Sequence, residues 1–145
     1  AGAENIFQAV EAGEKIEKDI VKEKGINLEV GFPEHLLDFT ILFVRLLRQS
    51  NNLQKKPSVR ASLGLYERAQ AHALLRKREV SIEDIQEVMI SVLSHRIELK
   101  PSVKYLQSTK EFIKEHFQQF LQKNQAGNIK NLEESDEDPG KGDFL

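Results

Sequence analysis

A serine, an arginine and two lysines within residues 55–60 are the side chains of this sequence best suited to bind an anion. Ser58 is a good N-cap, because its hydroxyl can accept a hydrogen bond from an unpaired first-turn N–H group. Arg60 then falls in the first turn, where the positive end of the helix dipole makes a cation unfavourable by a few tenths to about 1 kcal/mol. Lys55 and Lys56 add positive charge just upstream. The pattern is typical of a phosphate site at a helix N-terminus, and a solvated basic run without a ligand is the alternative.

The rest of the sequence offers little chemistry of its own. The four histidines (His35, His72, His95 and His116) are far apart, and no cysteine is present to complete a metal site. We expect each histidine to be a surface or boundary residue. Neither a phosphate loop of the G-x-x-x-x-G-K-[ST] type nor a G-x-S-x-G turn occurs. We therefore expect no metal site, and no enzymatic activity from this chain alone.

Length and composition indicate one domain. The 145 residues suffice for a modest core. No apolar run approaches the roughly 20 residues that cross a bilayer, and no signal-peptide pattern opens the sequence. The lack of cysteine is consistent with a reducing environment, so we expect a cytoplasmic location without membrane contact. Because the sequence begins with Ala1 and not methionine, we expect it to be a piece of a longer polypeptide.

The charge pattern divides the chain at residue 124. Residues 124–145 hold six acidic residues against two lysines, together with glycine, proline and few large apolar groups. This composition predicts a disordered acidic tail. Residues 1–123 are slightly basic and carry the apolar residues of a folded domain.

Hydrophobic periodicity predicts an all-α bundle of about five helices, with at most one or two very short strands. The first helix is expected over about 5–24. A second starts with Pro33 as its first residue and is apolar nearly all round, so it should be the buried central element. A third runs from about 59 to 77 and carries one stripe of small and apolar residues: Ala61, Leu65, Ala69 and Ala73. Together with Gly64, this stripe should let another helix approach closely.

Two further helices follow in the pattern. Ser81 and Asp84 form a capping-box-like start for the fourth. The fifth is expected to begin near Pro101. Its apolar face consists of Val103, Leu106, Ile113, Phe117, Phe120 and Leu121.

Three stretches of the sequence together resemble the lid of a MoxR-type AAA+ ATPase, a group that also contains the ATPase subunit of magnesium chelatase. They are Pro57-Ser58-Val59-Arg60-Ala61-Ser62-Leu63, Ala69-Gln70-Ala71-His72-Ala73-Leu74-Leu75-Arg76-Lys77-Arg78, and Val80-Ser81-Ile82-Glu83-Asp84-Ile85 with Val92-Leu93-Ser94-His95-Arg96-Ile97. The resemblance is best over 28–97. It is weaker in the first helix, and it is absent from the fifth helix and the tail.

The resemblance implies a role for the anion site. Arg60 matches the second-sensor arginine, which reaches the γ-phosphate of ATP at the cleft between ATPase core and lid. Ser58, Lys55 and Lys56 flank it as further candidate nucleotide contacts. Arg96 would be a structural or subunit-contact residue. ATP and Mg²⁺ would be bound mainly by the core of the parent ATPase, which supplies the Walker motifs that this sequence lacks.

The resemblance also implies partners. They are the core of the same polypeptide, neighbouring protomers of a homo-oligomeric ring, and a von Willebrand A-type protein. Two alternatives stay open: the lid of an MCM-like helicase, and a histone-like or other helical DNA-binding module with Arg60, Arg68, Arg76, Lys77 and Arg78 as phosphate contacts. The weakly basic charge of residues 1–123 disfavours nucleic acid as a partner.

Overall fold

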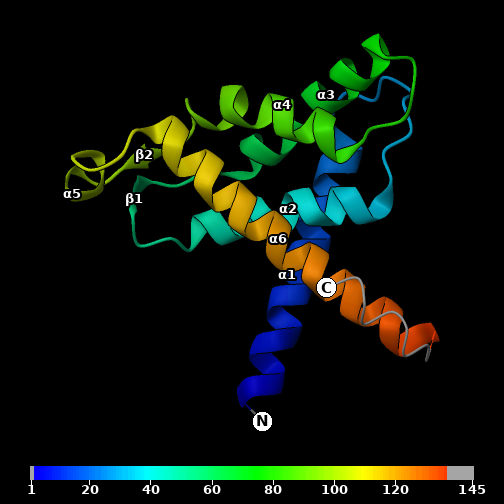
Figure 1. Ribbon diagram of the computed structural model, residues 1–145, viewed down its shortest axis with the longest axis horizontal. Coiled ribbons are helices and arrows are strands. Elements are labelled where there is room, and N and C mark those ends of the chain that lie inside the picture. The colour runs from blue at the N-terminus through cyan, green and yellow to red at the C-terminus, as the bar shows by residue number, and fades with distance from the viewer. Residues whose placement is uncertain (1, 137–145) are drawn as a thin grey trace. The chain divides into compact units, whose positions relative to one another are not determined.

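The computed structural model describes the backbone of residues 2–136 and the side chains of residues 12–124. It divides into two compact units, Ala1–Ile113 and Lys114–Leu145. The elements of the described residues are α1 (Gly2–Lys24), α2 (Glu34–Arg48), β1 (Leu53–Lys55), α3 (Val59–Leu75), α4 (Ile82–Leu93), β2 (Glu98–Leu99), α5 (Pro101–Lys104) and α6 (Thr109–Asp136) (Figure 1). The predicted all-α class with very short strands is confirmed.

The second helix is the buried central element that its sequence predicts. Its inward residues are Leu37, Thr40, Ile41, Phe43, Val44 and Leu47. Pro33, however, is the N-cap and not the first helical residue, because its ψ of 134° is extended. Its carbonyl accepts hydrogen bonds from the N–H groups of Leu36 and Leu37.

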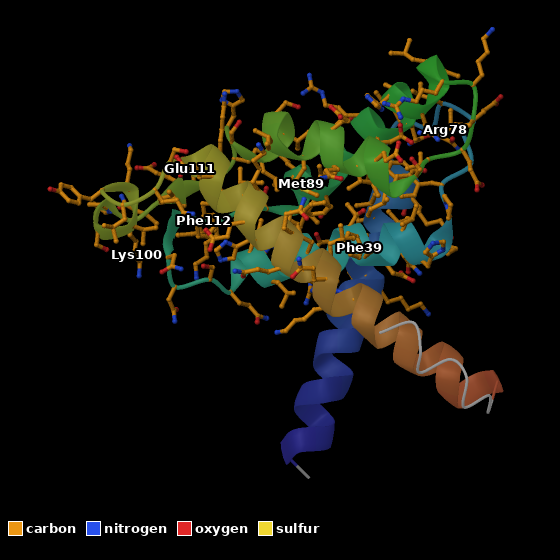
Figure 2. The ribbon with its side chains drawn as sticks, in the orientation of Figure 1. Phe39, Arg78, Met89, Lys100, Glu111 and Phe112 are labelled. Atoms are coloured by element: carbon orange, nitrogen blue, oxygen red, sulfur yellow. The ribbon has the colours of Figure 1, made fainter. Side chains whose placement is uncertain are left out.

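The third and fourth helices pack closely against each other. The predicted stripe of Ala61, Leu65, Ala69 and Ala73 is fully buried. A Cβ on Gly64 would lie 3.1 Å from Cγ1 of Val92 in α4, so glycine permits the close approach. Met89, labelled in Figure 2, is one of the α4 residues buried in the core.

The buried side-chain amide of Gln70 binds the segment after α1 to α3. The side chain of Gln70 is fully buried. Its Oε1 accepts from the N–H of Leu28 (2.9 Å), and its Nε2 donates to the carbonyl oxygens of Ile26 and Tyr66 (both 3.1 Å). Both amide protons and the amide oxygen of Gln70 thus bind backbone groups, and those of Ile26 and Leu28 lie outside any helix or strand. The end of α1 is thereby held against α3.

The chain between α2 and α6 differs from the prediction. The strands β1 and β2 pair antiparallel, with Leu53 opposite Leu99. The prediction of one helix from Pro101 is wrong. Two helices are present instead, because α5 ends at Lys104 and α6 begins at Thr109. Ser108 starts α6 anew: its hydroxyl accepts a hydrogen bond from the N–H of Glu111. Leu106 lies in the break and is 82% exposed, not in the core.

The last helix passes the predicted domain boundary. The helix α6 ends at Asp136, so residues 124–136 of the predicted tail are helical. Residues 137–145 lie outside the described part of the chain. Disorder of the tail stays a prediction. Among the described residues, no helix is long and apolar enough to cross a membrane.

Candidate functional site

The start of α3 has the local structure that the sequence predicts. Ser58 is extended (φ −95°, ψ −174°), and its Oγ accepts a hydrogen bond from the N–H of Arg60 at 3.2 Å. The first turn of α3 contains no acidic residue. The helix dipole is therefore uncompensated by side-chain charge at this end, which is the electrostatic condition for binding an anion.

The three basic side chains of the site are all exposed. Arg60 projects from the first turn of α3, Lys55 ends β1, and Lys56 follows it. The residue opposite Lys55 in the sheet is Glu98. Within residues 12–124, none of Arg60, Lys55 and Lys56 forms an ion pair. They are thus available to a ligand, and anion binding here stays a prediction.

An ion-pair cluster with a buried carboxylate contacts this helix start, and the sequence pattern does not reveal it. Glu17 of α1 is 3% exposed. Its carboxylate accepts hydrogen bonds from Nη1 and Nη2 of Arg48 (2.7 and 2.9 Å), from Oγ of Ser62 (2.6 Å) and from Nη1 of Arg45 (3.3 Å). The Nε of Arg48 donates to the carbonyl oxygen of Pro57 at 2.8 Å. One carboxylate therefore joins α1, α2 and α3.

The cluster keeps Glu17 ionised. Burial by itself would raise the pKa of this carboxyl. The hydrogen bonds from Arg48 and Ser62, with the charge of Arg48 and the contact to Arg45, outweigh that effect and lower the pKa below its ordinary value of 4.5. In the sequence, Glu17 is one of many charged residues of the first helix, which predicts a solvated face. Only its position on the same side as the buried Val21, four residues later, hinted at burial.

A second buried carboxylate lies between α3 and α4. Asp84 is fully buried. It accepts hydrogen bonds from the N–H (2.8 Å) and hydroxyl (2.9 Å) of Ser81, and lies 2.6 Å from Nδ1 of His72. Desolvation acts to raise the pKa of Asp84, but these hydrogen bonds lower it overall. The predicted capping-box start is confirmed. His72 is a boundary residue, as expected, but it has a specific partner that its sequence spacing did not reveal.

Other features bear on the alternatives. Among residues 12–124, no group of three potential ligands is placed to hold a metal ion. Two of the cations proposed for DNA contact, Arg76 and Arg78, both bind Glu83 (3.2 and 3.5 Å). Figure 2 shows Arg78 near the turn between α3 and α4. Arg68 donates to the hydroxyl of Ser91 at 3.3 Å. These contacts partly neutralise or occupy the surface that a DNA backbone would need.

Three cations that form no ion pair among residues 12–124, Lys55, Lys56 and Arg60, thus lie together at one capped helix start. Residues 47–115, a little under half of the chain, match the family model described as AAA lid domain. The match spans β1, the site and α3 to α5, and supports a helical lid of an AAA+ ATPase. A parent ATPase of this class typically forms oligomeric assemblies. No curated protein and no solved structure matches the chain significantly.

Proposed function

We propose that this chain is the lid of a MoxR- or magnesium-chelatase-like AAA+ ATPase, and that Arg60 is its second-sensor arginine. The observation that carries the proposal is the state of Arg60. It is an exposed guanidinium in the first turn of a Ser58-capped helix, without a carboxylate partner among the described residues. A cation in that position is unfavourable by itself and becomes favourable when an anion binds between it and the helix end.

The proposed chemistry is electrostatic. Arg60 would contact the γ-phosphate of ATP held by the ATPase core and stabilise the charge that develops during phosphoryl transfer. The hydroxyl of Ser58 is already engaged by the Arg60 N–H, so its contribution is to hold the helix start. Lys55 and Lys56 would add positive potential at the rim. The match to an AAA lid over residues 47–115 supports the lid assignment, on which this role of Arg60 depends.

The partners follow from the same proposal. The lid would contact the ATPase core of its own polypeptide and a neighbouring protomer of a homo-oligomeric ring. ATP and Mg²⁺ would be the cofactors, bound mainly by that core. A von Willebrand A-type protein is the partner that a MoxR-type ATPase implies. The first observation to make is the sequence of the native polypeptide upstream of residue 1, where a phosphate loop within about 200–250 residues is expected.

The decisive experiment is ATP turnover by the native polypeptide carrying Arg60→Ala. Removing a preorganised cation from the transferring phosphoryl group should lower kcat by about a hundredfold or more. The matched control is Arg68→Ala, which removes an exposed arginine from the middle of the same helix. The proposal fails if both variants hydrolyse ATP at the wild-type rate, or if they lose activity equally.

A further inference from the structure

The strongest unassigned feature of the described residues is the Glu17 cluster, because its carboxylate is buried and its contacts reach α3 on both sides of Arg60 in the sequence. Arg48 uses all three guanidinium nitrogens. Nη1 and Nη2 hold the Glu17 carboxylate, and Nε holds the carbonyl oxygen of Pro57. Pro57 is itself buried and immediately precedes the N-cap of α3. The planar guanidinium therefore sets the direction of the peptide from which α3 starts.

The Glu17 carboxylate also contacts α3 directly, at Ser62. Ser62 lies one turn inside α3 and is 1% exposed, and its hydroxyl donates to Oε2 of Glu17 at 2.6 Å. Arg60 thus lies between two points, Pro57 and Ser62, that are both tied to Glu17 of α1. Its own side chain has no ionic partner among the described residues to orient it. The cluster therefore holds the backbone position from which the Arg60 side chain extends.

We propose that Glu17 and Arg48 are positioning residues that lock the start of α3 to α1, so that Arg60 moves with α1 as one body. The proposal rests on the proposed function in so far as Arg60 acts on a phosphate. Its structural content, a fixed geometry between α1 and residue 60, stands separately. It assigns a role to α1, which lies outside the matched residues 47–115. Any displacement of α1 would then change the position of Arg60 at the nucleotide.

The geometry can be measured in the isolated chain. The sequence contains no cysteine, so Arg60→Cys and Asp19→Cys give two unique sites for spin labels, the second on an exposed position of α1. Pulsed electron paramagnetic resonance should give one narrow distance distribution. Arg48→Lys keeps the charge but cannot hold both partners of the guanidinium, and should replace the narrow peak by a broad one.

Arg45→Lys is the matched control. Arg45 also contacts Glu17, through one longer hydrogen bond of 3.3 Å, but it reaches neither Pro57 nor Ser62 in the described contacts. The distance distribution between the two spin labels should stay narrow in Arg45→Lys. The proposal is overturned if Arg48→Lys leaves the peak unchanged, or if Arg45→Lys broadens it equally. If circular dichroism shows that Arg48→Lys does not fold, Ser62→Ala takes its place, with the same two outcomes.

A turnover experiment on the native polypeptide tests the consequence for Arg60. Misplacing a catalytic group by about 1 Å can cost up to about a hundredfold in rate, so Arg48→Lys should lower kcat more than it changes KM. Adding Arg48→Lys to Arg60→Ala should cause no further loss, because Arg48 acts through Arg60. A further loss in the double variant would mean a general structural role and would overturn the inference. If Arg60→Ala alone leaves turnover unchanged, the proposed function fails, and the label distances still decide whether Glu17 and Arg48 position residue 60.

Discussion

Among single residues, Arg60 and Arg76 occupy opposite ends of α3 and therefore experience opposite ends of its dipole. Arg60→Ala should leave the chain folded and stabilise it by a few tenths to about 1 kcal/mol, since it removes a misplaced cation. Arg76→Ala should destabilise the chain by a similar amount, because it removes a favourable cation and its contact to Glu83. Urea unfolding of both variants checks the signs. A loss of several kcal/mol in Arg60→Ala would show that Arg60 has a structural role instead.

The two buried carboxylates predict how stability depends on pH. Folding lowers the pKa of Glu17 below 4.5 and of Asp84 below 3.8. Their contribution is complete above those ordinary values and is lost as the pH falls through the lower pKa values of the folded state. The urea concentration at the unfolding midpoint should therefore be constant from about pH 7 to about pH 5, and should decrease at pH values under about 4.5.

Asp84→Asn provides the comparison for this pH profile. The variant removes one of the two carboxylates, so it should be less stable at neutral pH and show a shallower fall in acid. Acid profiles of the same steepness in the variant and the wild type would contradict the assignment of Asp84 to this dependence.

Three glycines lie where helices meet. The atoms around each glycine predict how strongly an alanine at that position would destabilise the fold. A Cβ on Gly13 would meet only the flexible end of Arg45, although at 2.6 Å. On Gly64 it would lie 3.1 Å from Val92, and on Gly25 it would lie 2.6 Å from a backbone oxygen and 2.7 Å from the ring of Tyr66. Thermal unfolding should find Gly25→Ala most destabilised and Gly64→Ala next. Gly13→Ala should be near neutral, because alanine gains up to about 1 kcal/mol of helix propensity.

At Gly25, side-chain packing and not backbone conformation requires glycine. It directly follows α1, as a C-cap glycine would, but no glycine among the described residues has a positive φ. The crowding by Tyr66, whose ring stacks on Phe32 at a centroid distance of 5.4 Å, requires the missing side chain instead. If Gly25→Ala proves more stable than Gly64→Ala, the packing of α1 on α3 is looser than the structure indicates.

For the whole molecule, the folding unit is larger than the segment that matches the AAA lid. Val21 of α1 and Leu37 and Ile41 of α2 are buried in one cluster with Tyr66 of α3. A fragment of residues 47–115 would expose Tyr66 and lose the carboxylate that holds Ser62. We expect it to lack a cooperative thermal transition, and a fragment of residues 12–124 to retain one. Circular dichroism of both fragments tests this, and cooperative unfolding of 47–115 would show that α1 and α2 are dispensable.

Local patterns made much of the helical architecture predictable. The alanine stripe of α3, the Ser58 cap and the Ser81 start with Asp84 depend on residues a few positions apart, so spacing alone reveals them. The same holds for the central burial of α2. The break before α6 was missed, because an apolar helical period continues on both sides of Ser108 and hides the new cap.

The all-α class, the capped start of α3 and the placement of Arg60 in its first turn follow from the sequence, because each is a local property of neighbouring residues. Which carboxylates are buried, and which cations they meet, depends on how the helices pack. Glu17 and Arg48 are far apart in the chain, and they meet because the packing of α1, α2 and α3 brings them together. Burial then makes their pairing obligatory, since an ionised carboxylate removed from water must be compensated by hydrogen bonds and opposite charge.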